Sequence, residues 1–292
     1  MSSLKEIKGR IASVKSTKKI TSAMKMVASA KLRKSQYKIE QFLPYERRLT
    51  SILNNFLSGY SEDEFSSLLA EVRTIHRVSI VVLSSNSSLC GAFNSNIIRN
   101  LNDRVQKYLD MKYEIEIYPI GKKVEEAVRK LKIPVEIKGS YISLMDNPTF
   151  EGAKNIADSL MNDFLTCKID QVDLLYNHFK STAIQIPTEE HFLPIDLSKQ
   201  MKSKAIPIDY LVEPDRKTLL ETLIPRSLRS KIYAILLDSA AAEQAARTVA
   251  MQIATDNADD ILSDLTIQYN KQRQQSITSE ILDIIGGSEA LK

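Results

Sequence analysis

Residues 226–285 read RSLRSKIYAILLDSAAAEQAARTVAMQIATDNADDILSDLTIQYNKQRQQSITSEILDII, and the sixty residues contain neither glycine nor proline. A helix of that length would extend roughly 90 Å, at about 1.5 Å per residue. Its apolar residues recur at gaps of three, four, seven or eight, which predicts one helical stripe that Gly286-Gly287 ends. The stripe comprises Leu228, Ile232, Ile235, Ala242, Ala246, Val249, Ile253, Ile261, Leu265, Tyr269, Ile277, Ile281 and Ile284.

The opposite end of the chain supplies a partner for this helix. Residues 10–43 also lack glycine and proline, and a second stripe comprises Leu4, Ile7, Ile11, Val14, Met24 and Ala28, with Thr17 and Thr21 filling two slots. Residues 1–48 hold thirteen Lys and Arg against three acids, a net charge of +10. Residues 238–292 hold nine acids against four Lys and Arg, a net charge of −5. Two long stripes on helices of opposite net charge predict an antiparallel coiled coil. The alanine run from Ala240 to Ala258 would let the two helix backbones approach closely.

Length and composition indicate the number of domains and argue against membrane-spanning, secreted and disulfide-rich proteins. The 292 residues suggest about two domains, and a hydrophobic content of 43% is enough for a core. No run of eighteen apolar residues exists, and the first residues lack the pattern of a signal peptide. Two cysteines without a CxxC motif suggest reduced thiols in a cytosolic compartment.

An open α/β sheet is predicted between the two helices. Apolar runs or alternation indicate strands at 77–83, 113–120, 134–137 and 171–179, with helices at 97–109, 121–131 and 150–165 between them. Residues 183–187 and 191–195 suggest a closing hairpin or a pair of edge strands. The expected organisation is an N-terminal coiled-coil helix at 1–58, a Rossmann-like domain at 74–195 and a C-terminal coiled-coil helix at 208–292. Residues 59–64 are expected to be a loop, and the polar residues 196–207 to be mobile.

The chemistry expected of such a sheet is largely missing. The loop at Ser84–Asn94 lacks G-x-G-x-x-G and the Lys-Ser/Thr of a phosphate-binding loop, so nucleotide binding there has weak support. Cys90 is interpreted as a structural thiol, because His76, His178 and His191 come with no base-orienting pattern. No catalytic residue, metal site or cofactor is predicted. The basic first helix fits a solvated face, a nucleic-acid surface without a recognised motif, or a docking surface for an acidic protein.

Several motifs resemble one family. RIASVKSTKKITSAMKMVA at 10–28 is similar to the start of the gamma subunit of F-type ATP synthase, the central rotor shaft. EQAAR at 243–247, ATDNA at 254–258, YNK at 269–271 with Arg273, and SIT at 276–278 with Glu280 resemble its C-terminal signature. LCG at 89–91 with Asn94 resembles the family's central loop. Asp209-Tyr210 with Glu213-Pro214 resembles the segment that leads into the family's second long helix.

The resemblance implies a non-catalytic subunit that transmits rotation of the membrane c-ring to the alpha and beta subunits, coupling ion flow to ATP synthesis or hydrolysis. Hexamer contacts carry over to Met24, Lys25, Arg247, Gln274, Thr278 and Glu280. Tyr210 carries over to the foot near the epsilon subunit and the c-ring, and residues 284–292 to an apolar bearing. The resemblance also implies that the chain binds no cofactor and no nucleic acid. It implies a peripheral location on the cytoplasmic face of a bacterial inner membrane.

Two departures from the family pattern matter. Ser85-Asn86-Ser87-Ser88 stands where the family usually has Ser-Asp-Arg/Lys-Gly, which removes a charged pair and a glycine. The cysteine-bearing insertion of the chloroplast form is missing, so thiol control is not expected. Two alternatives stay open: a nucleotide-binding α/β enzyme and a basic coiled-coil module that binds nucleic acid.

Overall fold

The computed structural model describes residues 4–58, 67–131, 134–195, 212–213 and 215–289. They form two compact units, one of residues 1–28 with 248–292 and the other of residues 29–247. The long helices α1 (Leu4–Ser58) and α7 (Arg216–Glu289) contribute to both units. The loop expected at 59–64, the polar segment 196–207 and Tyr210 lie outside the described residues.

Both terminal helices continue through residues that usually interrupt helices. Pro44 lies inside α1, as expected, and Pro225 lies inside α7. An interior proline costs about 3 kcal/mol or more, and burial of the neighbouring Ile224 and Leu228 offsets that cost. The predicted stop at Gly286-Gly287 is wrong, because α7 continues through both glycines to Glu289. A helical glycine costs only about 1 kcal/mol relative to alanine and therefore does not force an end.

In the first unit, α1 and α7 run antiparallel. Lys18 forms an ion pair with Asp259, and the hydroxyl of Thr255 donates to that of Thr21 at 2.9 Å. The seam of α1 alternates gaps of three and four, as in a heptad repeat. It comprises the buried Ile7, Thr21 and Ala28 and the half-buried Leu4, Ile11, Val14, Lys18 and Lys25. Thr17, predicted to fill a seam slot, is exposed and donates to the carbonyl of Ser13; the slot belongs to Lys18.

The seam of α7 differs from the predicted stripe. In the first unit it comprises the buried Met251, Ala258 and Leu265 and the half-buried Thr255, Leu262, Tyr269, Gln272 and Ser276. Five members of the predicted stripe are exposed instead, namely Ile253, Ile261, Ile277, Ile281 and Ile284. In a heptad repeat, seam residues recur every 3.5 residues on average. The predicted stripe also allowed gaps of eight residues, and it therefore joined residues from two different faces of the helix. The sequence stripe therefore combined the seam with a second, uncovered apolar face.

The second unit contains a five-stranded sheet in the order β3-β2-β1-β4-β5. Its strands are β1 (Arg77–Leu83), β2 (Glu114–Ile120), β3 (Val135–Ile137), β4 (Gln171–Phe179) and β5 (Gln185–Leu193). The first four are parallel, as is usual for the open α/β sheet that was predicted, and β5 is antiparallel to β4. The two separate edge segments predicted at 183–187 and 191–195 are wrong, since one strand covers residues 185–193. An edge strand tolerates Pro187 and the polar residues after it, because one side of its backbone carries no ladder.

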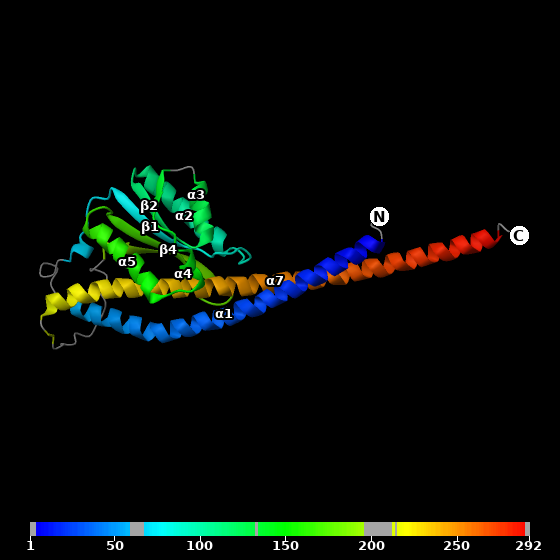
Figure 1. Ribbon diagram of the computed structural model, residues 1–292, viewed down its shortest axis with the longest axis horizontal. Helices are drawn as coiled ribbons and strands as arrows, with labels where there is room; N and C mark the ends of the chain where they lie inside the picture. Colours follow the sequence, from blue (N-terminus) through cyan, green and yellow to red (C-terminus); the bar gives the residue numbers. More distant parts are fainter. Residues whose placement is uncertain (1–3, 59–66, 132–133, 196–211, 214, 290–292) are drawn as a thin grey trace. The chain divides into compact units, whose positions relative to one another are not determined.

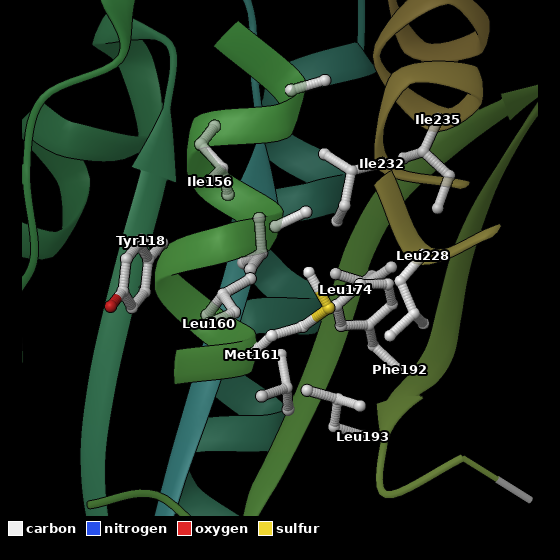
Figure 2. Close-up of a cluster of buried hydrophobic side chains, with 14 of the residues drawn as sticks. Tyr118, Ile156, Leu160, Met161, Leu174, Phe192, Leu193, Leu228, Ile232 and Ile235 are labelled. Carbon is white, nitrogen blue, oxygen red and sulfur yellow. The ribbon is translucent and has the colours of Figure 1, made fainter. Parts of the chain in front are cut away.

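Helices cover both faces of this sheet (Figure 1). They are α2 (Phe93–Asp110), α3 (Lys122–Lys130), α4 (Ile142–Asp146) and α5 (Phe150–Leu165), with a 3₁₀ turn η1 at Leu68–Ala70. The short helix α4 was not predicted. One face packs on α2 and α3, around Ile97, Leu101 and Val124. The other packs on α5 and α7, where Leu160 and Met161 of α5 and Ile232 of α7 meet Leu174 of β4 (Figure 2).

Candidate partner interface on the helix pair and the central loop

Arg247 of α7 binds the loop that follows β1, here called the central loop (residues 84–94). Its guanidinium donates to the carbonyl of Ser88 at 2.5 Å and to that of Ser87 at 3.4 Å. It also pairs with Glu243, one helical turn earlier, at 2.7 Å. Arg247 and Glu243 are both buried, with 8% and 6% of their surfaces exposed. Arg247 therefore fastens the central loop to α7.

The electrostatics of this pair follow from its burial. Burial raises the pKa of Glu243 above its ordinary value, although the hydrogen bond and positive charge of Arg247 oppose that shift. Removing one partner of a buried pair leaves an uncompensated charge, which typically costs about 3–5 kcal/mol. The pair is thus a fixed part of the second unit.

The central loop is held together by its own polar atoms. The side-chain oxygen of Asn94 accepts from the N–H of Ser85 at 3.0 Å, and its amide nitrogen donates to the thiol sulfur of Cys90 at 3.2 Å. Cys90 is buried and packs with Phe93, Ala242 and Ala246. These contacts agree with the prediction of a structural thiol.

Asn86 shows what replaces the family's charged pair. Its amide nitrogen donates to the carbonyl of Ile142 and to Asp146, both at 2.8 Å, at the two ends of α4. Its oxygen accepts from the N–H of Lys122, at the start of α3, at 3.0 Å. One neutral amide therefore joins the loop to two helices, and no sequence motif indicated this role.

Met24 and Lys25 lie on α1 within the first unit, and both are half-buried. Around them, Ile20, Met26 and Val27 expose 57%, 64% and 58% of their surfaces. Three large apolar side chains exposed within two turns, beside lysines, are typical of a surface that a partner covers.

The three candidate residues near the end of α7 also lie in the first unit. Gln274, Thr278 and Glu280 are exposed, and the Thr278 hydroxyl donates to the carbonyl of Gln274 at 2.9 Å. Gln274 and Thr278 border a hollow of about 860 Å³ that Leu4 of α1 also lines. The structure thus brings two candidates to one place, whereas Arg247 lies buried in the other unit.

The histidines on strands have acidic partners that sequence reasoning missed. His178 of β4 hydrogen-bonds Asp238 of α7 at 2.7 Å, and His191 of β5 hydrogen-bonds Asp173 of β4 at 3.0 Å. Burial alone would raise the pKa of Asp173, but hydrogen bonds from His191, Tyr108 and Gln171, with the charge of Arg104, outweigh burial and hold it below its ordinary value. These acids come from neighbouring strands or distant helices, so no local spacing could have indicated the pairs.

The described residues contain neither a helix suited to span a membrane nor a metal-binding cluster. Across the helices of residues 4–58, 67–131, 134–195 and 215–289, none combines the length and apolar character that crossing a membrane would need. In the same ranges, His, Cys, Asp and Glu side chains form no group of three that could hold a metal ion.

Comparison with known proteins adds the decisive observation. The family model described as ATP synthase matches residues 3–291. The ATP synthase gamma chain of Azobacteroides pseudotrichonymphae is 56% identical over 294 residues, covering all of both chains. The chain belongs to the ATP synthase gamma-chain family. The gamma chain of Phocaeicola vulgatus is 54% identical and covers 99% of this chain and all of its own.

Solved structures of mitochondrial ATP synthases contain chains with the same fold. The central stalk and c-ring structure of Tetrahymena thermophila mitochondrial ATP synthase contains a chain with a TM-score of 0.58 and 25% identity, covering 80% of this chain and 99% of that one. A Euglena gracilis mitochondrial ATP synthase structure gives a TM-score of 0.66 at 18% identity, over 99% and 94% of the two chains. The gamma chain is the rotor subunit of the central stalk, and the predicted family and fold class are both confirmed.

Proposed function

We propose that this gamma chain transmits rotation between a membrane c-ring and a hexamer of alpha and beta subunits, without a catalytic site of its own. The exposed apolar face of α7 supports this proposal most directly. Eight large apolar residues expose between 46% and 71% of their surfaces, namely Ile253, Ile261, Ile267, Ile277, Ile281, Leu282, Ile284 and Ile285. Exposed apolar side chains in this number, outside the seam of the helix pair, are typical of a surface that partners cover.

The mechanism would be allosteric coupling between the angle of the gamma chain and each catalytic site. A helix pair with different side chains on each face offers each of the three surrounding sites a different contact. The angle can then favour an open or a closed site only through the difference in contact free energy between those states. The net charge of +10 on residues 1–48 would help set preferred angles against acidic loops of the beta subunits.

We assign the partner contacts as follows. Met24, Lys25, Gln274, Thr278 and Glu280 would face the hexamer, and Tyr210 would lie near the epsilon subunit and the c-ring. Arg247, held by Ser88 and Glu243, would act by fixing the central loop on α7 as well as by any contact with the hexamer. Through these partners the chain would sit peripherally on the cytoplasmic face of a bacterial membrane.

The two cysteines permit a direct test by single-molecule rotation. Cys167 is exposed, whereas Cys90 is buried, so a maleimide should attach a bead to Cys167 alone. The labelled chain is assembled with matching alpha and beta subunits that are fixed to a surface, and ATP is added. We expect ATP-driven turning of the bead in one direction, and hydrolysis only by the assembled mixture.

The control is Cys167→Ser, which should assemble and hydrolyse ATP but carry no bead. Hydrolysis with a stationary bead would contradict the proposal of a rotating shaft. ATP binding by the isolated chain would instead support the alternative of a nucleotide-binding enzyme.

A further inference from the structure

The second unit contains a cavity of about 610 Å³ between α1, α7 and the sheet. Ile39 and Phe42 of α1 form one wall, and Ile235 and Leu237 of α7 form the opposite wall. Phe179 of β4 lines it from the sheet. Its volume lies within the range of small-molecule sites, roughly 300–1,000 Å³, and its walls are mainly apolar, as in such sites.

The cavity lies along the α1–α7 pair between two closely packed points. At one point Leu32 of α1 packs against Ala241 and Ala245 of α7, and at the other Leu53 joins the main core. The intervening seam residues Ile39, Phe42 and Glu46 are only half-buried. Phe42 still reaches Tyr233 of α7, with ring centroids 4.8 Å apart, and Ile39 packs against the cluster of Leu32, Ala241 and Ala245. The space beside these contacts is filled by no side chain of the described residues.

Most charged groups lining the cavity are already neutralised. Lys231 pairs with Glu190 at 2.8 Å, and His178 hydrogen-bonds Asp238 at 2.7 Å. Asp238 also accepts from the backbone N–H of Phe179 at 3.1 Å. Among the described residues, Glu46 and Arg47 of the lining form no ion pair with an opposite charge.

Glu46 and Arg47 differ in position. Glu46 is half-buried at a seam position and accepts one hydrogen bond, from the Thr50 hydroxyl at 3.1 Å; within the described part of the chain it forms no ion pair. Arg47 is exposed, and so is solvated. A carboxylate in a partly apolar cavity is stabilised by a cation more strongly than one in water, since the local dielectric constant is lower.

We propose that this cavity binds a small amphipathic amine, whose ammonium group pairs with Glu46 and whose apolar body lies against Phe42, Ile235 and Phe179. Carboxylate and aromatic rings together suit an organic cation, because ring faces also attract positive charge. This inference is independent of the proposed rotary role, and binding can be measured on the full-length chain.

Isothermal titration calorimetry at pH 7 tests the proposal with three probes of similar size: 4-phenylbutylamine, 4-phenylbutan-1-ol and 4-phenylbutyrate. We expect the amine to bind about tenfold more tightly than the alcohol, since a charge-assisted hydrogen bond contributes that much. The anionic probe should bind more weakly than either. If the unmodified chain binds the amine and the alcohol with equal affinity, the proposal is overturned without any variant.

Two variants locate the site. Glu46→Gln keeps the shape of the side chain and should reduce the amine's affinity to that of the alcohol. Glu40→Gln is the matched control, an exposed acid of the same helix outside the cavity, and should change nothing. Ala234→Phe places a ring in the cavity and should abolish binding of both probes. Unchanged amine affinity in Glu46→Gln would reject the assignment of Glu46.

Discussion

At the scale of single residues, Gly121 shows how tightly the central loop is built. It precedes α3 with a φ of +107°, and an ideal Cβ there would lie 2.1 Å from the carbonyl oxygen of Ser84. Ser84 is buried, and its hydroxyl accepts from the N–H of Val124 at 2.9 Å. Only glycine meets both the backbone angle and the close approach.

Gly121→Ala is therefore expected to destabilise the chain by about 3 kcal/mol, from backbone strain and the displacement of Ser84. Gly9→Ala is the matched control, because Gly9 lies inside α1 with no atom within 4 Å of the added carbon. It should stabilise by about 0.5–1 kcal/mol through its helix propensity. Urea unfolding followed by circular dichroism measures the free energy of unfolding of both variants. Equal effects would contradict the requirement for glycine at position 121.

The residue scale is also where prediction from sequence was weakest. The turn after β1 could be predicted from local pattern, and Cys90 was expected to be a half-buried structural thiol, whereas the structure buries it fully. The bonds of Asn86 and Arg247 could not, because Arg247 and Ser88 are 159 positions apart in the chain. Such pairs become visible only once the fold has brought the two segments together.

At the scale of elements, small residues let α1 and α7 approach in the second unit. Ala241 and Ala245 are fully buried and pack against Leu32 of α1. A larger side chain at these positions has no space without separating the helices. The alanine run of the sequence, which predicted a close approach, is confirmed at this contact.

Ala241→Leu should consequently destabilise the chain by about 1–3 kcal/mol, the usual cost of overpacking a filled core. Ala30→Leu makes the same substitution at an exposed position of α1 and should change stability by about 0.5 kcal/mol or less. Thermal unfolding of the two variants distinguishes them. A stable Ala241→Leu variant would mean that the helices separate there without cost.

The elements themselves were largely predictable, but the phase of the seam was not. Buried apolar strands and long stretches without glycine or proline identify strands and helices from periodicity alone. The seam, however, includes the polar Lys18, Thr21 and Gln272, while Ile253 and Ile277 are exposed. A pattern search for apolar residues therefore selects part of the wrong face, since the partner helix decides which residues are covered.

At the scale of the whole molecule, the end of α7 contributes little to the chain's own packing. Described side chains from Ile277 to Ile285 are exposed. Removing residues 276–292, by truncation after Gln275, should therefore change the free energy of unfolding by about 0.5 kcal/mol or less. In the assembled complex the same truncation should weaken assembly or coupling, because it removes Thr278, Glu280 and the exposed apolar face.

Analytical ultracentrifugation and ATP hydrolysis of the reconstituted complex check the second half of this prediction. Gln268→Ala, at an exposed position of the same helix, is the control, and it should behave as the full-length chain. Large destabilisation of the free, truncated chain would show instead that residues 276–292 support its fold.

The polar seam of the first unit has a consequence for sliding. If α1 moved along α7 by one heptad, about 10 Å at 1.5 Å per residue, Lys18 would leave Asp259 and Thr21 would leave Thr255. A purely apolar seam would resist such slippage far less, because a shift by one heptad restores similar apolar contacts. A lysine in the seam specifies one alignment, because only that alignment places it beside its acidic partner. The two polar contacts thus fix one alignment of α1 on α7 within the first unit, and a helix displaced along the seam would return to that alignment.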